Sequence, residues 1–227
     1  MVSVFDDADA LAAAAADAVL DAAADAGAGF RLGLSGGETP RRLYGLLARE
    51  PRRTALLASR PVILFADERA VPPDDAASNY RLVRQTLLDP CGIAEADVHR
   101  MRGEAADLEQ AALDYESAVA EPIDLLILGI GPDGHTASIF PGSAAARERQ
   151  RRVVAVENSP KPPPRRLTIT PRVIREAKRI LVLATGTDKA EAVAKALDAA
   201  TDQVQLPARL LRHAHWFLDR AAARFLA

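Results

Sequence analysis

His135 follows a long apolar stretch and lies in a glycine-rich loop. Residues 123–130 read Ile-Asp-Leu-Leu-Ile-Leu-Gly-Ile, and residues 131–135 read Gly-Pro-Asp-Gly-His. An apolar run without regular polar alternation predicts a parallel strand covered on both faces. In an open α/β sheet the ligand site lies beyond the carboxyl ends of such strands. Because imidazole titrates near neutrality, His135 is the side chain best suited to move a proton there.

The segment Ser35-Gly36-Gly37 follows a predicted strand at residues 30–34 and precedes a predicted helix. Its backbone N–H groups are unobstructed by side chains, and a helix N-terminus concentrates unpaired donors and positive potential. The turn is therefore a natural anion site. The same glycines would equally serve a tight turn that needs a positive φ, and the sequence leaves both interpretations open.

Two carboxylates and a guanidinium, Asp67-Glu68-Arg69, come just after another predicted strand at residues 61–65. An arginine can hold a carboxylate or a phosphate through two parallel hydrogen bonds. Charged residues at a strand end are also common on ordinary protein surfaces. This triplet is a candidate binding segment whose alternative is a solvated surface.

Lys189 lies at a further predicted helix start, in Thr185-Gly-Thr-Asp-Lys189. A lysine in the first turn of a helix opposes the helix macrodipole, which favours a functional role such as phosphate binding by a point charge. The loop 161–166 contains three more cations. Most of these are expected to be solvated, and Arg166 is the preferred ligand because it begins a predicted strand.

Residues 129–134 match the dinucleotide-binding pattern G-x-G-x-x-G after a strand, but their context argues against that function. Pro132 removes a backbone donor inside the loop, and Pro141 leaves little room for the long helix that should follow. We therefore expect no nucleotide cofactor.

The sequence also predicts no metal site and no serine-hydrolase elbow. His213 and His215 could share one face of a strand, but Cys91 and His99 show no ligand spacing with them. Cys91, the only cysteine, has no basic partner close in sequence that would activate its thiol. No G-x-S-x-G segment is present.

Strand and helix signals alternate along the chain and predict one α/β domain over residues 1–227. An alanine-rich helix comes first, Thr39 is expected to cap a helix with Pro40 at its first position, and Ser78 is expected to cap another. Further strands are predicted at 152–156, 166–170 (half-exposed), 179–184 and 216–218, and further helices near 108–119, after Pro171, from Lys189 and at the C-terminus. The predicted architecture is a doubly wound, mostly parallel sheet with helices on both faces and room for a small subsidiary sheet.

Composition narrows the possible partners. The formal net charge is −2 over 227 residues, which points to neither nucleic acid nor an acidic membrane. The alanine-rich N-terminal segment is interrupted by aspartates, so it is expected to be neither a signal peptide nor a spanning helix. A single cysteine fits a reducing compartment, so we expect a cytoplasmic protein without an obligate protein partner.

Taken in order along nearly the whole chain, these segments resemble the 6-phosphogluconolactonase family, within the wider group of glucosamine-6-phosphate deaminase-like sugar-phosphate enzymes. The resemblance is carried by Leu34-Ser-Gly-Gly-Glu-Thr-Pro40, Asp67-Glu-Arg69, Val71-Pro-Pro73, Ser78-Asn-Tyr80, Gly129-Ile-Gly-Pro-Asp-Gly-His-Thr-Ala-Ser-Ile-Phe-Pro-Gly142, Pro162-Pro-Pro-Arg-Arg-Leu-Thr168, Thr185-Gly-Thr-Asp-Lys-Ala190 and Trp216-Phe-Leu-Asp219. It implies the NagB/RpiA-like fold. Ala66 and Glu38 depart slightly from the lactonase pattern, but neither removes a charged group that the chemistry needs.

The resemblance implies hydrolysis of 6-phospho-D-glucono-1,5-lactone in the oxidative pentose phosphate pathway, with no metal, cofactor or covalent intermediate. His135 would be the general base, and Asp133 or Asp67 would orient it. Loop N–H groups near Gly131 and Gly134 would stabilise the oxyanion. Phosphate and ring hydroxyls would be bound by Arg69, Arg166 and Lys189 together with Ser35, Gly36 and Gly37.

Two alternatives stay open. A glucosamine-6-phosphate deaminase or isomerase shares the glycine turn and the Asp-Gly-His segment, but this chain has Asp-Glu-Arg where the deaminases have Asp-Glu-Tyr, and it lacks an evident counterpart of their second acid. A non-catalytic sugar-phosphate sensor could use the same fold. The intact His135 and the absence of an appended DNA-binding helix pair favour the enzyme.

Overall fold

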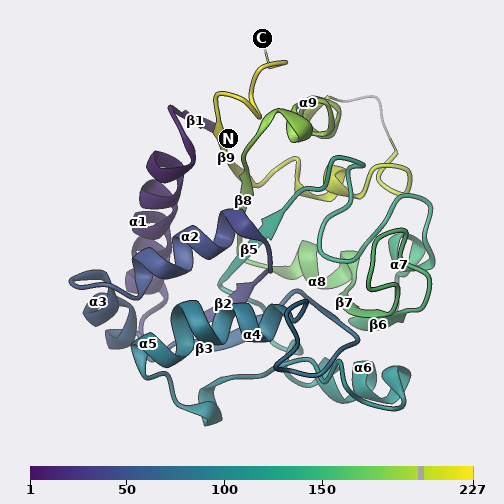
Figure 1. The fold of residues 1–227 in the computed structure, drawn as a ribbon, viewed down its shortest axis with the longest axis horizontal. Coiled ribbons are helices and arrows are strands. Elements are labelled where there is room, and N and C mark those ends of the chain that lie inside the picture. The colour runs from purple at the N-terminus through teal and green to yellow at the C-terminus, as the bar shows by residue number, and fades with distance from the viewer. Residues whose placement is uncertain (199–201, 227) are drawn as a thin grey trace.

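A computed structural model describes residues 1–198 and 202–226 of the chain (Figure 1). The strands are β1 Val2–Phe5, β2 Arg31–Leu34, β3 Val62–Phe65, β4 Asp67–Arg69, β5 Leu125–Gly129, β6 Val153–Val156, β7 Arg166–Ile169, β8 Arg179–Ala184 and β9 His215–Asp219. The helices are α1 Ala8–Ala26, α2 Glu38–Leu47, α3 Arg52–Ala58, α4 Asn79–Val83, α5 Asp89–Cys91, α6 Leu108–Glu116, α7 Ala144–Arg147, α8 Pro171–Glu176 and α9 Ala190–Leu197.

Six strands form a parallel sheet in the order β1-β9-β8-β5-β2-β3. From β2 the chain continues outward to β3, whereas from β5 it continues in the opposite direction to β8. This reversal is a topological switch point, where open α/β sheets form their ligand crevice beyond the carboxyl ends of the strands. The loops after β2 and β5 flank that point.

Three further strands form a small antiparallel sheet in the order β4-β7-β6. Backbone hydrogen bonds join it to the large sheet: the Ile169 amide donates to the carbonyl of Ala66, 2.8 Å away, and the Ala66 amide donates to that of Leu34, also at 2.8 Å. The predicted subsidiary sheet is therefore present, and it lies at the carboxyl edge of the large one.

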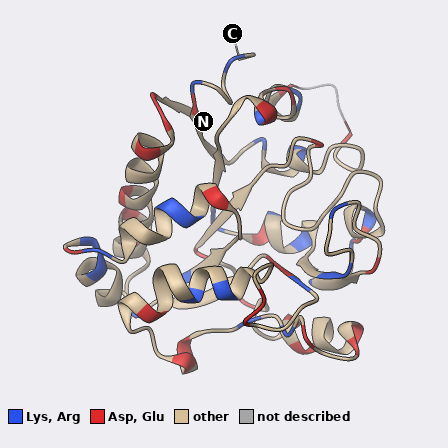
Figure 2. Cartoon of the chain, viewed as in Figure 1, with Lys and Arg blue, Asp and Glu red and all other residues tan. Residues whose placement is uncertain are grey.

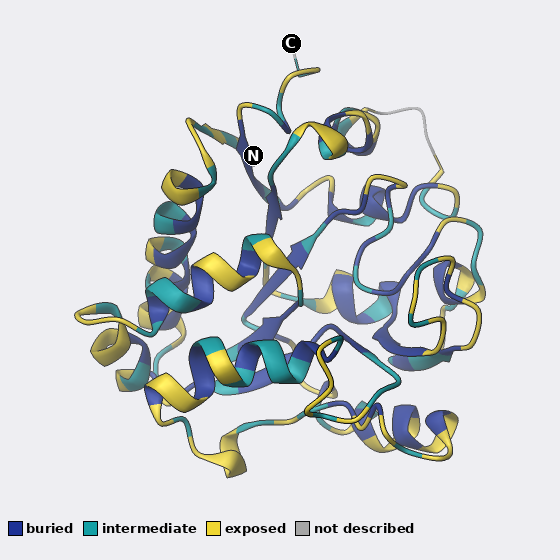
Figure 3. Ribbon diagram, viewed as in Figure 1, coloured by how far each residue is buried: buried dark blue, intermediate teal, exposed yellow. Residues whose placement is uncertain are grey.

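Helices cover both faces of the large sheet. In Figure 1, α2 and α4 lie in front of the strands and α8 lies behind them. The central strands are dark blue in Figure 3 because their side chains are enclosed between these layers, and the core includes the fully buried Trp216, Phe30 and Leu128. Charged residues of both signs are spread over the helices and loops (Figure 2). The α/β class and the doubly wound sheet are thus confirmed.

Several local predictions were wrong, each for a physical reason. Thr39 does not cap α2: Gly37, whose φ of +116° suits glycine, takes that position, and the Thr39 hydroxyl instead lies 2.8 Å from that of Thr185. All of β7 is buried rather than half-exposed, because Arg166 lines the pocket described below and the Thr168 hydroxyl accepts from the Ser138 amide. Ser78 does cap α4, with its hydroxyl accepting from the Arg81 amide.

Other elements were missed or misplaced. Strands β1 and β4 and helix α3 had not been predicted, and the residues after β9, as far as 226, form turns where a helix was expected. None of the described helices is both long and apolar enough to cross a membrane.

Candidate active site

A small hollow of about 200 Å³ opens at the switch point, beyond the carboxyl ends of β2, β5 and β8. Of the eleven residues predicted from the sequence to handle protons or substrate, all but Asp133 and Gly134 line it. The large sheet supplies the loops with Ser35, His135 and Lys189, and the small sheet supplies Asp67, Arg69 and Arg166 from β4 and β7. Segments that are far apart in sequence therefore meet at this edge.

His135 is fixed by Asp133 from the same loop. The imidazole Nδ1 lies 2.5 Å from Asp133 Oδ1, and the ring packs on Phe140 with a centroid separation of 4.7 Å. Burial acts to raise the pKa of Asp133, but the hydrogen bond with His135 and the electrostatic interactions with His135 and Lys161 outweigh it and hold that pKa well below its ordinary value. An ionised Asp133 accepts the Nδ1 proton, which leaves Nε2 with a free lone pair.

Gly131 and Gly134 shape this loop, and their own amides bond within it. The Gly131 amide donates to the His135 carbonyl and the Gly134 amide to the Gly131 carbonyl, both at 2.9 Å. A Cβ on Gly131 would come within 2.0 Å of the imidazole Cε1 and Nδ1 atoms. The glycine at 131 therefore makes room for the histidine ring. The binding of an oxyanion by loop N–H groups near Gly131 and Gly134 stays a prediction.

Asp67 lies in the hollow but does not orient His135. Its Oδ2 accepts from the Ser138 hydroxyl at 2.6 Å, and its Oδ1 accepts from the Asn79 amide nitrogen at 3.2 Å. Asp67 is 5% exposed. Of the two carboxylates that were predicted to orient the histidine, the structure pairs only Asp133 with it.

The neighbouring Glu68 is a buried anchor rather than a surface charge. It accepts four hydrogen bonds, from the amides of Arg69, Asn79 and Tyr80 and from the Ser78 hydroxyl, at 2.7–3.0 Å. Burial nevertheless raises the pKa of its carboxyl above the ordinary value. Glu68 thereby ties β4 to the start of α4 and fixes the backbone on which Arg69 is mounted.

Arg69 turns its guanidinium toward the hollow while one nitrogen, Nη1, donates to the carbonyl of Ala77 at 2.5 Å. Its Nε is buried without a hydrogen-bond partner among the described residues. A buried unpaired donor costs free energy. Arg69 also lines the hollow, so part of its side chain faces the site.

Arg166 was predicted to bind the substrate, but in the structure its guanidinium makes hydrogen bonds to the protein itself. Its guanidinium donates to the carbonyls of Lys161, Pro162 and Pro163 at 3.0, 3.3 and 3.0 Å, and also to the Ser138 hydroxyl at 3.3 Å. It lies over the Phe140 ring and is 4% exposed. Burial and the nearby Arg69 lower the pKa of this guanidinium, in spite of Asp67. Its fork clamps the loop 161–163 in place.

The turn Ser35-Gly36-Gly37 keeps the features of an anion site. The Ser35 hydroxyl donates to the Ile127 carbonyl at 2.8 Å, and the Ser35 carbonyl accepts from the buried Tyr44 hydroxyl at 2.7 Å, so the turn is held on both sides. No acceptor for the Gly36 and Gly37 amides occurs among residues 1–198 and 202–226. These donors lie at the N-terminus of α2, where anions are favoured.

Lys189 also lines the hollow, in a single 3₁₀ turn, Thr187–Lys189, that precedes α9. Its ammonium lies 3.0 Å from the carboxylate of Asp188, which is largely exposed. The residue therefore precedes the helix rather than standing in its first turn. Its charge is available to the hollow.

Lys161 was not selected from the sequence, yet it lines the hollow beside the histidine. Its ammonium nitrogen lies 3.4 Å from both Asp133 Oδ1 and His135 Nδ1. The sequence signal was ambiguous, because this lysine stands in a loop with two other cations and four prolines. What distinguishes it is the hold of Arg166 on its carbonyl, which no spacing pattern reveals.

The histidines considered as metal ligands have other contacts. His215 Nε2 lies 3.0 Å from the Ser3 hydroxyl, and the His213 Nε2 accepts from Arg212 at 2.7 Å. Cys91 is buried, and burial raises the pKa of its thiol, which disfavours the reactive thiolate.

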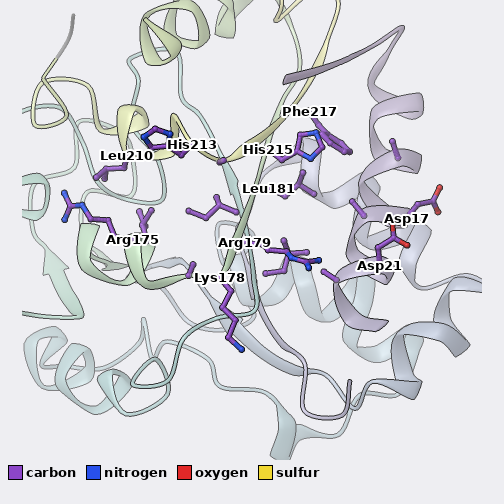
Figure 4. Close-up of a pocket in the computed structure, with 18 residues that line it drawn as sticks. Asp17, Asp21, Arg175, Lys178, Arg179, Leu181, Leu210, His213, His215 and Phe217 are labelled. Atoms are coloured by element: carbon purple, nitrogen blue, oxygen red, sulfur yellow. The ribbon is translucent and has the colours of Figure 1, made fainter. Parts of the chain in front are cut away.

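A larger hollow of about 890 Å³ lies at the opposite, amino edge of β8 and β9, between α1 and α8 (Figure 4). Its floor includes Leu181 and Phe217. Two of its charged rim residues form ion pairs within the protein, Lys178 with Asp124 and Arg179 with Asp25, each at 2.7 Å. The smaller hollow brings together a histidine that can transfer a proton and several cations that can bind an anion. We therefore assign the candidate active site to the smaller hollow.

Comparison with known proteins places these features in a wider context. The family described as glucosamine-6-phosphate isomerases/6-phosphogluconolactonase matches residues 6–218. A human protein named 6-phosphogluconolactonase is 42% identical over 248 aligned residues, which cover 100% of this chain and 93% of the human one.

Solved structures agree with that match. The 6-phosphogluconolactonase from Leishmania guyanensis superposes with a TM-score of 0.87 at 30% identity, covering 100% of this chain and 98% of that one. A monomeric glucosamine-6-phosphate deaminase superposes with a TM-score of 0.84 at 27% identity, covering 98% of each chain.

Proposed function

The chain belongs to the glucosamine-6-phosphate isomerase/6-phosphogluconolactonase family, and on this premise we propose that it hydrolyses 6-phospho-D-glucono-1,5-lactone to 6-phosphogluconate with His135 as the general base. The observation that carries the proposal is the pairing of His135 with Asp133, because it leaves a basic nitrogen on a residue that lines the hollow. A lactone carbonyl is already electrophilic, so activation of water suffices.

The steps follow from that geometry. His135 Nε2 takes a proton from water as the water oxygen attacks the lactone carbonyl carbon. The tetrahedral oxyanion then collapses and breaks the bond to the ring oxygen, which receives the proton from the imidazolium. The new carboxylic acid ionises, and His135 is again neutral. Asp133 stabilises the transient imidazolium, as its short contact with Nδ1 allows.

The remaining groups position the substrate and counter its charge. The free amides of Gly36 and Gly37 and the ammonium of Lys189 form the phosphate end of the site. Arg69 reaches the sugar from the small sheet. The phosphate and the developing oxyanion are both negative. The cations of the hollow therefore bind the phosphate, and they stabilise the transition state more than the lactone, whose carbonyl group is uncharged.

The test is a rapid assay on freshly generated lactone, corrected for spontaneous hydrolysis. His135→Ala should lower kcat by about a hundredfold to ten-thousandfold, the usual contribution of a general base. Binding of 6-phosphogluconate, measured by calorimetry, should stay largely intact. His213→Ala, at an exposed histidine outside the site, is the control and should keep full activity. An unchanged kcat in His135→Ala would overturn the assignment.

A deaminase or isomerase activity is the second candidate, because a deaminase shares the fold so closely. Ammonia release from glucosamine 6-phosphate without lactone hydrolysis would establish it. Tight binding of 6-phosphogluconate with no turnover of either substrate would instead identify a sensor. Arg69 and the missing second acid favour the lactonase.

The proposed reaction needs no metal or cofactor, and its substrate is a phosphosugar lactone. We place it in the cytosol, since the single cysteine of the chain is free and needs no oxidising compartment.

A further inference from the structure

Lys161 brings a third charge to the pair formed by Asp133 and His135. Its ammonium contacts the same oxygen, Asp133 Oδ1, that accepts from the imidazole, and it lies equally close to His135 Nδ1, at 3.4 Å in each case. The lysine side chain is 39% exposed and the histidine 17%. One carboxylate oxygen is therefore shared between two groups that can each be cationic.

This arrangement penalises one protonation state. If His135 became an imidazolium before substrate arrived, two cations would lie 3.4 Å apart with a single carboxylate oxygen between them. Like charges at such a distance disfavour the charged form of the titrating group. A neutral His135 has no such conflict, and only the neutral form can accept a proton from water.

The position of Lys161 is not left to a flexible side chain alone. Arg166 binds the carbonyls of residues 161–163, and the Ser159 hydroxyl donates to the Lys161 carbonyl at 2.9 Å and accepts from its amide at 3.2 Å. The Ser159 amide closes the loop on the Pro164 carbonyl at 2.8 Å. Several buried or half-buried groups thus hold the backbone of residues 159–163 in place.

We propose that Lys161 is a positioning residue that keeps Asp133 aimed at His135 and opposes protonation of the imidazole before the lactone binds, and that Arg166 acts through it. The inference rests on the proposed function of His135. It assigns Arg166 a task other than the phosphate contact that the sequence predicted.

The other charges around His135 belong to fixed parts of the hollow. Asp67 and Arg69 face it from β4, Arg166 from β7, and Lys189 from the turn before α9. Of the cations in the hollow, Lys161 has a direct contact with the imidazole, whereas Arg166 is directed at carbonyls and Ser138. Removal of Lys161 therefore changes the charge next to His135 with the least disturbance of the rest.

The experiment is the pH dependence of kcat/KM for Lys161→Met, Lys161→Arg and the wild type. Lys161→Met should move the midpoint of the acid limb to higher pH by about half a unit to one unit, because loss of a nearby cation stabilises the imidazolium. Lys161→Arg should leave the midpoint in place. Lys178→Met, at a lysine paired with Asp124 at the opposite edge, is the matched control and should behave as wild type.

Salt supplies an independent readout. Because Lys161 is partly exposed, high ionic strength should screen it and move the wild-type midpoint toward that of Lys161→Met, which should itself respond less. A purely structural role would lower kcat without moving the midpoint. An acid limb unchanged in Lys161→Met, with His135→Ala still inactive, would overturn this inference alone and leave the base assignment standing.

Arg166→Lys tests whether Arg166 acts through Lys161. It should shift the midpoint in the same direction as Lys161→Met and add little to it in the double variant. Ser159→Ala loosens the same backbone without touching the buried guanidinium, and it should give a smaller shift even if Arg166→Lys folds poorly. A rise in KM with no shift in either variant would show that Arg166 acts on substrate directly.

Discussion

At the scale of residues, the contacts of His135 with Asp133 and Lys161 determine what the loop 131–135 can do. The sequence indicated His135 from its loop and left Asp133 and Asp67 open as its partner, and the structure pairs Asp133 with it. Loop N–H groups near Gly131 and Gly134 were expected to stabilise an oxyanion, and the structure shows the amides of these two glycines bonded inside the loop. A sequence shows that a glycine is needed, but whether it frees a donor or makes room for a neighbouring ring depends on coordinates. Lys161 was passed over for the same reason.

Lys189 gives a prediction at this scale. Its side chain is argued to hold the phosphate, which is present equally in substrate and transition state, so Lys189→Ala should chiefly raise KM. A charge-assisted hydrogen bond of this kind corresponds to a rise of about tenfold to a hundredfold. Steady-state kinetics on the lactone provide the measurement.

The control is Lys195→Ala on α9, where the lysine pairs with Glu191 on the surface. It should leave KM unchanged. A loss confined to kcat in Lys189→Ala would move that residue from the phosphate to the reacting centre.

At the scale of elements, the small sheet was the hardest part to foresee. β4 is three residues long and entirely charged, so neither alternation nor apolar character identifies it as a strand. It forms because Glu68 is buried on the cap of α4 and because its backbone pairs with β7. These contacts are distant in sequence, whereas strands β2, β3, β5 and β8 of the large sheet can be recognised from local apolar runs.

Replacement of Glu68 tests that element. Glu68→Gln exchanges one acceptor oxygen for an NH₂ group, which would then face donors that already need an acceptor. The free energy of unfolding should fall by about 1–3 kcal/mol, the cost of buried donors without partners. Urea denaturation measures it.

Glu157→Gln is the comparison, since Glu157 is exposed and its pair with Arg165 lies on the surface. A surface pair of this kind contributes about 0–1 kcal/mol. Equal stabilities of the two variants would show that the Glu68 cap is not what holds β4.

At the scale of the whole molecule, the two sheets share one core. Leu167 and Ile169 of the small sheet belong to the same cluster of buried side chains as Trp216 and Leu128 of the large one. The single domain over residues 1–227 thus stays a prediction, and the shared core of the two sheets supports it. The doubly wound order could be anticipated from the alternation of strands and helices, but the first edge strand β1 was hidden by the alanine-rich helix that follows it.

A single domain should unfold in one step. Trp216 is the only tryptophan, is fully buried, and its indole donates to the Leu211 carbonyl at 2.9 Å. Its fluorescence and the far-UV circular dichroism of the whole chain should therefore show coincident transitions in urea. Two separated transitions would mean that part of the chain folds on its own.

The placement of the site between two sheets has a consequence for substrate range. His135 follows β5 of the large sheet and Arg69 ends β4 of the small one, so the distance between the two side chains depends on how the sheets pack against each other. A change of one methylene group between the sheets would alter this distance without touching any group in the hollow. Substitutions in the core between the two sheets would thus change the preference among lactones of different ring size, with every side chain that lines the hollow left as it is.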